Sequence, residues 1–380
     1  MVNSGRNAEK SAAALLDAAF DQRDGCRPAG TAPRVGVFGN GFPEVLVAAS
    51  GAVPVHVNFG QPGASFSTVD CIAEIIEPFV DDEVRLFLMR FVAGHFADYR
   101  GIVFARDDAP ALIAYQYATE WVRQGRAHGK VPPLFLWNLV HTDSGPVRCF
   151  NQVQAGKLFD FLVSIGLPRP GEASIASASA HEQSRRTKLA AMERAETIPG
   201  SVALRWRNAG RFMAAQDHAR LLGEALAQPL VADDDASSAR LGIVGSSLAS
   251  KATYAAFERF GRVVADLQPW GQVWPGRDTA PNVEAILTVA AADPFCPRIT
   301  PANVHRQALV AAAVAARCDL MICQLAHTDD TFGWEVPALK ADLAAEGIDF
   351  VNLGFRDAEP DNNWFDQSAG LIAAALGARA

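Results

Sequence analysis

The chain has few cysteines and no long apolar run. Six cysteines occur in 380 residues, and no two of them form a Cys-x-x-Cys pair. So sparse and irregular a set excludes the disulfide framework of a small secreted domain and fits free thiols in a reducing cytosol. No window approaches the roughly 18–20 continuous apolar residues of a membrane span. The N-terminal segment also lacks the basic start and apolar core of an export signal. We therefore expect a cytoplasmic protein without a membrane partner.

Positive charge is also scarce. The formal net charge is −8, and Lys and Arg form no long cluster. Proteins that bind nucleic acid through phosphate contacts need such a cluster, so we expect no nucleic-acid partner. A chain of 380 residues exceeds what one hydrophobic core usually holds, which predicts more than one domain.

Short apolar runs alternate with longer helical patterns, which favours parallel α/β architecture. RVGVFG at 34–39 predicts a strand, and RLGIVG at 240–245 repeats its pattern of residue types. A helical stretch over 180–228 and a loop-like segment over 231–240 separate the two halves. We therefore predict two Rossmann-like lobes with parallel sheets joined by a helical segment, with boundaries at 1–150, 151–235 and 236–380. The alternative is a chance similarity between common α/β sequences.

Two glycine-bearing turns follow predicted strands, where open α/β sheets bind ligands. The candidate cofactor-binding residues there are Gly39, Gly41, Gly245 and Ser246. Backbone N–H groups at such turns can hold a phosphate or carboxylate. The alternatives are turns that simply need glycine, and a helix cap at Ser246. Glu44 follows the first turn, and either contacts a ligand or stabilises its own helix N-terminus.

Acidic residues close two other predicted strands. Asp107 and Asp108 follow GIVFAR, while His327, Asp329 and Asp330 follow DLMICQLA. Carboxylate and imidazole groups that converge at strand ends suit a hard divalent metal or acid–base catalysis. The alternative is that these aspartates are solvated loop residues or helix N-caps.

The last of these strands also contains cysteine. Cys323 lies inside the apolar run and Cys318 just before it. Iron–sulfur and structural zinc sites commonly contain close cysteine pairs, whereas free cysteine is among the most buried residue types. We predict that both thiols are packing groups and that the functional end of this segment is 327–330.

Four segments resemble one family of enzymes. They are GNGFPEVLVAASGAVPVHV (39–57), SRRTKLAAMERA (184–195), RLGIVGSSLASKATYAAFERFGRVVADL (240–267) and ARCDLMICQLAHTDDTFGWEVPALKADLAAEGIDFVNL (316–353). In order and spacing they are similar to subunits of the 2-hydroxyacyl-CoA dehydratase and benzoyl-CoA reductase family. The resemblance implies an acyl-CoA enzyme that forms homo- or hetero-oligomers with a family paralogue. It also implies a [4Fe-4S] cluster held by cysteines at three points and reduced by a separate activator protein.

The chain departs from this family at the three cluster-ligand positions. They fall on Asp81, on Asp107 or Asp108, and on Asp329. A carboxylate is a poor substitute for thiolate on such a cluster. The resemblance as a whole predicts a subunit that acts on or binds an acyl-CoA thioester between the lobes, as a dehydratase (lyase) or reductase.

Two alternatives stay open. A family member without the cluster could bind a divalent metal through Asp81, Asp108 and Asp329, or use acid–base chemistry. The candidate catalytic residues are then Glu44, His327 and Asp329. The chain could also be a non-catalytic partner of an active paralogue.

Overall fold

The structure, a computed structural model, describes most of the chain. The described residues are 11–23, 31–58, 75–106, 109–126, 129–195, 197–228, 238–272, 281–296, 299, 301 and 303–377. The candidate residues Asp107 and Asp108 lie outside these ranges, as do the thiols of Cys26 and Cys71.

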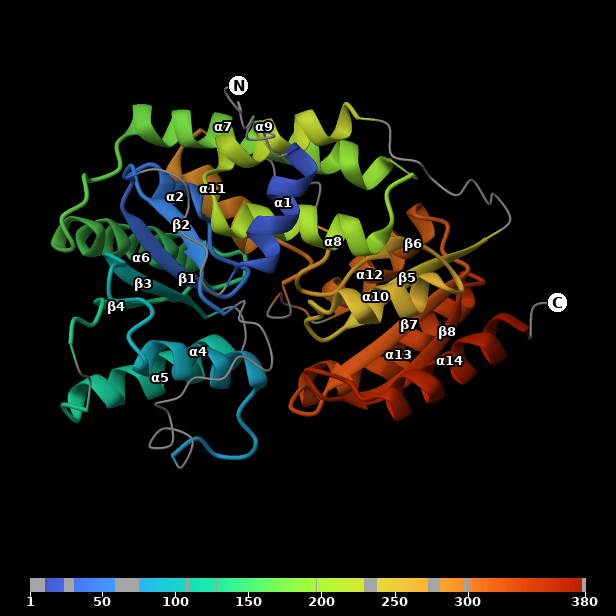
Figure 1. Cartoon of the computed structure of the whole chain (residues 1–380). Coiled ribbons are helices and arrows are strands. Elements are labelled where there is room, and N and C mark those ends of the chain that lie inside the picture. The colour runs from blue at the N-terminus through green and yellow to red at the C-terminus, as the bar shows by residue number, and fades with distance from the viewer. Residues whose placement is uncertain are drawn as a thin grey trace, which may run out of the picture.

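Two parallel sheets form the framework (Figure 1). The first has the strand order β2-β1-β3-β4, with β1 at Arg34–Phe38, β2 at Val53–His56, β3 at Gly101–Ala105 and β4 at Leu134–Trp137. The second has the order β6-β5-β7-β8, with β5 at Ala239–Gly245, β6 at Gly261–Asp266, β7 at Leu320–Ala326 and β8 at Asp349–Arg356. In both sheets the first strand of the lobe lies between the second and the third, and the fourth lies at the edge. The predicted pair of Rossmann-like lobes with parallel sheets is confirmed.

Helices surround and connect the sheets (Figure 1). In the first lobe they are α2 (Val45–Ala48), α4 (Asp82–Val92), α5 (Ala109–Arg123) and α6 (Gly145–Ser164). The helical segment contains α7 (Glu172–Arg194), α8 (Gly200–Ala209), the 3₁₀ turn η1 (Gly210–Phe212) and α9 (Ala215–Leu226), with α1 (Ala12–Asp21) beside it. The second lobe has α10 (Lys251–Glu258), α12 (Asn303–Ala315), α13 (Asp330–Ala345) and α14 (Asn362–Gly377), and α11 (Val283–Ala291) lies between α10 and α12 in sequence.

Apolar side chains alternate between the two faces of each sheet, because successive strand residues point to opposite sides. In β3, Ile102 and Phe104 pack in the core that includes α4 and α5, while Val103 packs on the opposite side. In the second sheet, Cys323 packs beneath α12 and α13, in the same core as Cys318. The prediction that these two thiols are packing groups is therefore confirmed.

The packing crosses the predicted boundaries at three places. Helix α6 runs through residue 150 and packs on the first sheet. Helix α1 packs mainly on α8 and α9 of the helical segment, through Leu16 and its neighbours. Helix α11, from the C-terminal third of the sequence, packs against α6 of the first lobe. The three segments therefore share apolar cores.

Two segments with a helical sequence pattern lie partly outside the described residues. The pattern over 68–93 contains α4, which begins at Asp82, and residues 59–74 are not described. The pattern that starts at Thr300, itself not described, contains α12, described from Asn303. Among the helices that the structure describes, none is long and apolar enough to span a bilayer.

Candidate active site between the two lobes

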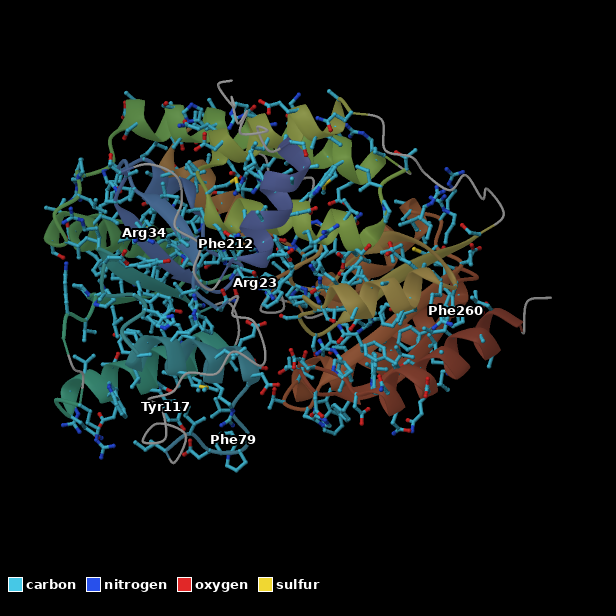
Figure 2. All side chains as sticks on the ribbon, in the orientation of Figure 1. Arg23, Arg34, Phe79, Tyr117, Phe212 and Phe260 are labelled. Carbon is cyan, nitrogen blue, oxygen red and sulfur yellow. The ribbon has the colours of Figure 1, made fainter. Side chains whose placement is uncertain are left out.

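The carboxyl ends of the two sheets come together at a group of polar side chains, which we call the interlobe cluster. Its members are Asn40, Glu44, His56, Asn58, Asp81, Glu83, Arg185, Arg211, Ser246, Ser247, Thr328, Asp329 and Arg356. Figure 2 shows the side chains between the lobes and marks Phe212, the residue after Arg211 in η1. The first lobe, the helical segment and the second lobe each contribute to the cluster.

A direct hydrogen bond joins the two lobes. Thr328, in the loop after β7, donates its hydroxyl hydrogen to Asp81 Oδ2 over 2.8 Å. Asp81 also caps α4, since its Oδ1 accepts the Glu83 N–H at 2.8 Å. Burial, and to a smaller extent the negative charge of Asp329, raises the pKa of the Asp81 carboxyl. Asp81 and Asp329 therefore lie near each other, as the sequence predicted.

Asp329 is also tied to its surroundings. Its Oδ1 accepts the Phe332 N–H at 3.0 Å and caps α13, and its Oδ2 accepts the Ser246 hydroxyl at 2.7 Å. The alternative considered for Asp329, a helix N-cap, thus describes it, and Asp81 caps a helix as well. The metal role assigned to them stays a prediction, and so does the role of Asp108 outside the described residues.

Glu83 has the most unusual electrostatic setting in the cluster. Asn58 Nδ2 donates to its Oε2 at 3.0 Å, and the hydroxyl of Ser247 in the other lobe also bonds it. Removal from water and the adjacent charge of Asp81 raise the pKa of Glu83 from 4.5 to about 8. A carboxyl with this pKa is protonated at neutral pH and can both give and accept a proton there.

His56 links the acidic and basic parts of the cluster. Its Nδ1 is 3.1 Å from Arg211 Nη1, and its Nε2 is 2.7 Å from Glu44 Oε1. Arg211 can only donate, so Nδ1 is the acceptor and Nε2 carries the hydrogen that goes to Glu44. Burial and the charge of Arg211 lower the pKa of His56. The imidazole is therefore a neutral ring held in one tautomer.

Glu44 stands in the N-cap position just before α2, but its side chain makes no capping hydrogen bond. Burial alone would raise its pKa, but the charge of Arg185, at 3.4 Å, and the hydrogen bond from His56 lower it below the usual range. Glu44 is therefore a permanent anion that orients His56. The alternative considered for it, a carboxylate serving its own helix N-terminus, does not match these contacts.

Two arginines bring positive charge to the acidic end of α4. Arg211 donates to Asn40 and Asn208, each over 2.7 Å, and burial lowers its pKa to about 10. Arg356 is buried, donates to the backbone carbonyl of Ser247 and is attracted by Asp81, Asp82 and Glu83. An anionic group entering between the lobes would meet both guanidinium charges.

The predicted cofactor-binding residues lie at the expected strand ends. Gly39 and Gly245 both have positive φ, 109° and 114°, so each turn requires a residue without Cβ. Ser246 is buried, and its Oγ donates to Asp329 and accepts the Ala326 N–H at 2.8 Å. Ser250, not Ser246, caps α10. Cofactor binding by Gly39, Gly41, Gly245 and Ser246 stays a prediction.

His327 turns away from Asp329. Its side chain is 62% exposed, stacks on Phe355 and lies 3.3 Å from Asp357. Asp329 instead faces Ser246. The structure thus brings Asp329 into the interlobe cluster with Glu44 but gives His327 different partners. The catalytic roles of all three residues stay predictions.

The described cysteines do not fit the iron–sulfur cluster that the resemblance implies. Cys318 and Cys323 are buried in the second-lobe core, where burial raises the pKa of each thiol to about 12. Cys149 is exposed on α6, and Cys296 bonds a histidine. Within the part of the chain that the structure describes, no three Cys, His, Asp or Glu side chains form a metal-binding group.

Several members of the cluster were not identified from the sequence, among them Glu83, His56 and Arg211. Glu83 occupies the first turn of α4, where a carboxylate normally serves the helix dipole, so its position carried no distinct signal. His56 ends a strand at the same edge as Gly39, and that placement could have identified it. Arg211 lies in a helical segment with many arginines, and only the folded chain sets it beside His56.

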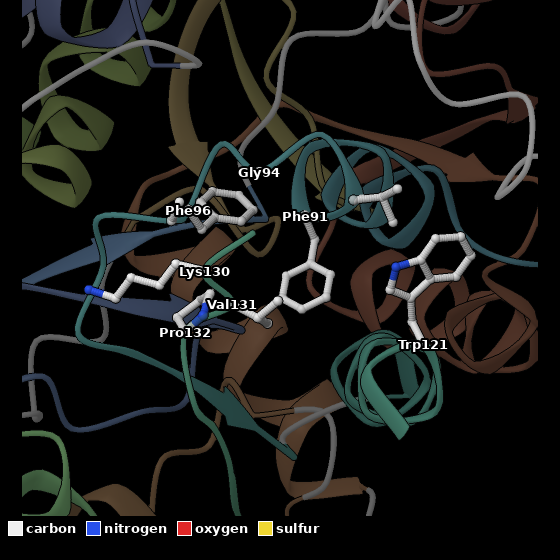
Figure 3. Close-up of a pocket in the computed structure, with 9 residues that line it drawn as sticks. Phe91, Gly94, Phe96, Trp121, Lys130, Val131 and Pro132 are labelled. Atoms are coloured by element: carbon white, nitrogen blue, oxygen red, sulfur yellow. The ribbon is translucent and has the colours of Figure 1, made fainter. Parts of the chain in front are cut away.

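A separate hollow lies at the other end of α4 (Figure 3). Its lining includes Phe91, Phe96, Trp121, Lys130 and Val131. Since α4 is 11 residues long, this hollow is about 15 Å from the cluster along the helix axis. Lys130 is the charged residue of this lining.

Comparison of the sequence with protein-family models finds no match, and comparison with curated proteins finds no relative.

Proposed function

We propose that the chain is a cytoplasmic enzyme subunit that binds an acyl-CoA thioester between its lobes and acts on it by acid–base chemistry, as a lyase related to the 2-hydroxyacyl-CoA dehydratase and benzoyl-CoA reductase family. The observation that carries the proposal is Glu83, whose pKa of about 8 suits proton transfer at neutral pH. The substrate class comes from the sequence resemblance. The same resemblance supports an oligomer, formed with a copy of the chain or with a paralogue.

The chemistry assigned to the cluster is proton movement beside the thioester carbonyl. Ionised Glu83 takes a proton from the α-carbon, whose electron pair moves to the thioester oxygen as an oxyanion. Protonated Glu83 then returns a proton to the α-carbon as the electron pair moves back. Asn58 and Ser247 hold its carboxyl, while Glu44 and Arg211 hold His56 as a neutral partner. The described cysteines do not provide the ligands of an iron–sulfur cluster, and the proposed proton transfer does not require one.

Two arginines supply the charge that an acyl-CoA needs. Arg211 comes from the helical segment and Arg356 from β8, and the charge of Glu83 acts on both. A guanidinium beside a thioester oxygen stabilises negative charge that develops there. The acidic cluster alone would repel an anionic substrate, so this pair is what makes an acyl-CoA compatible with a chain of net charge −8.

Solvent exchange tests the proposal without requiring the identity of the acyl group. Purified protein is incubated in D₂O with a panel of 2-hydroxyacyl-CoA and arylacyl-CoA thioesters, and deuterium entering the acyl chain is measured by mass spectrometry. Wild-type protein should exchange at least one member of the panel. Glu83→Gln keeps the shape but cannot cycle a proton, and should lose about 100-fold or more in rate.

A matched control is Glu224→Gln on the exposed surface of α9, where Glu224 pairs with Arg220. This variant should exchange at the wild-type rate. The proposal fails if no thioester of the panel exchanges with wild-type protein, or if Glu83→Gln and Glu224→Gln behave alike.

A further inference from the structure

A cysteine and a histidine that the proposed function does not use form a hydrogen-bonded pair. The Sγ atom of Cys296 lies 3.5 Å from Nε2 of His141. His141 Nδ1 is 3.2 Å from the carbonyl oxygen of Ala291. A carbonyl oxygen can only accept, so Nδ1 carries the hydrogen and the lone pair of Nε2 faces the thiol. The imidazole is thus placed to take the thiol proton.

The backbone around both side chains is fixed. Asn151 of α6 accepts the Val140 N–H and donates to the Val140 carbonyl, each over 3.0 Å, which holds the residue before His141. The turn that carries Cys296 is closed by its N–H to the Asp293 carbonyl at 3.2 Å. The side chain of Asp293 also accepts the Phe295 N–H at 2.9 Å.

Tertiary packing brings the pair together. His141 follows β4 in the first lobe, and Cys296 follows α11, 155 positions later in the sequence. Helix α11 packs on α6 of the first lobe. The contact between thiol and imidazole therefore depends on this packing between distant parts of the sequence. The described part of the structure thus contains a nucleophile, a base and a group that orients the base, which is the general arrangement of an activated thiol.

We propose that Cys296 and His141 form a nucleophilic thiol site that reacts with hydrogen peroxide. His141 Nε2 accepts the thiol proton, and the thiolate attacks one peroxide oxygen. An S–O bond forms as the O–O bond breaks, and the departing hydroxide takes the proton from Nε2 to become water. The sulfur is oxidised by two electrons to a sulfenic acid, and the peroxide is reduced. The site is independent of the acyl-CoA proposal.

The size of the site selects the oxidant. Cys296 is 6% exposed and His141 8%, so this largely buried pair favours a small oxidant over a bulky one. Hydrogen peroxide is such a small oxidant, whereas a CoA thioester is bulky. Cys318 is an internal comparison, since it is also 6% exposed. Burial raises the pKa of the Cys318 thiol to about 12, and the charges acting on it are those of Arg240 and Asp319 rather than an imidazole.

The test measures sulfenic acid at each thiol of the full-length protein. After timed exposure to hydrogen peroxide and quenching with catalase, the chain is unfolded in the presence of dimedone, digested and analysed by mass spectrometry. Cys296 should be oxidised at least about tenfold faster than Cys318, because its thiolate fraction is larger. Equal rates at the two sites would overturn the proposal.

Substitutions test whether the imidazole of His141 causes the faster oxidation of Cys296. His141→Gln should slow oxidation of Cys296 about tenfold, towards the rate of an ordinary thiol. The matched control is His305→Gln, since His305 bonds the Pro294 carbonyl on the other side of the same turn, at 3.0 Å. It should leave the rate unchanged. An unaffected Cys296 in folded His141→Gln contradicts the proposal.

A pH profile of the wild-type protein keeps the test decisive if His141→Gln does not fold. The oxidation rate of Cys296 should level off at a pH below the ordinary thiol pKa of about 8.5. A rate that continues to rise through and beyond that pH would show a thiol without an activating base.

Discussion

Thr328 and Asp81 are 247 positions apart in sequence, yet the hydroxyl of Thr328 donates to the carboxylate of Asp81 over 2.8 Å. The bond connects the loop after β7 to the start of α4, and it lies beside the contact between Asp329 and Ser246. The two lobes are thus fastened at the carboxyl ends of their sheets, at the place where the interlobe cluster contains its ionisable groups.

Thr328→Val should weaken this fastening. The valine keeps the branched shape but removes the donor, so Asp81 loses a hydrogen bond and the free energy of unfolding should fall by about 1 kcal/mol. Denaturant titration measures the change. Thr187→Val is the control, since its exposed hydroxyl donates to the Gln183 carbonyl of its own helix and its loss should cost less than about 0.5 kcal/mol. An equal fall in the free energy of unfolding for the two variants would show that the bond between Thr328 and Asp81 does not stabilise the fold.

Glu83 should make the fold less stable in alkaline solution. Its pKa rises from 4.5 to about 8 on folding, so between these values the folded chain keeps a proton that the unfolded chain releases. The folded state then binds more protons, and the free energy of unfolding decreases as pH rises through this window.

Unfolding of wild-type protein and of Glu83→Gln at pH 5.5 and 8.5 checks this dependence. Glutamine cannot ionise, so the variant should lose less stability than wild type between the two pH values. The same loss in both proteins would contradict a raised pKa at Glu83.

Arg211→Met should raise the pKa of His56. The charge of Arg211 is one of the two main causes that lower it, and the opposite charge of Glu44 remains in the variant. Titration of the histidine ring signals by NMR measures the shift. His305 serves as an internal reference, because burial lowers its pKa and Arg211 is not among the charges acting on it. An unmoved His56 would show that the guanidinium does not control this ring.

Gly245→Ala should be strongly destabilising. The backbone at Gly245 has φ 114°, and a Cβ placed there would lie 2.0 Å from the Gln324 carbonyl oxygen. The expected cost exceeds about 2 kcal/mol. Gly156→Ala in α6 is the contrast, because its added Cβ would meet no described atom within 4 Å beyond its chain neighbours and the nearby backbone of its own helix. That variant should gain about 0.5–1 kcal/mol from the helix propensity of alanine. Thermal unfolding of both proteins checks the opposite signs.

The strands and their glycine turns could be predicted from local sequence. RVGVFG and RLGIVG became β1 and β5 with their turns, and in each the final glycine has the positive φ that its position requires. Burial of Cys318 and Cys323 followed from the absence of close cysteine pairs. These predictions succeeded because strand propensity, alternation and glycine geometry act over a few neighbouring residues.

The polar contacts of the candidate site could not be predicted in this way. Glu44 was expected to serve a ligand or its own helix, and it instead orients His56 and pairs with Arg185, 141 positions away. His327 and Asp329 are two positions apart but face different partners. A charged side chain bonds whatever folding places beside it, and the local sequence does not contain that information.

By itself the sequence determined two similar lobes of parallel sheet, because the alternation of apolar runs and the glycines at their ends admit little else. Only the tertiary structure decided that Glu83 is held in a setting that raises its pKa and that Cys296 meets His141. Both depend on charges and dipoles brought together from distant segments, and electrostatic interaction follows distance in space rather than separation along the chain.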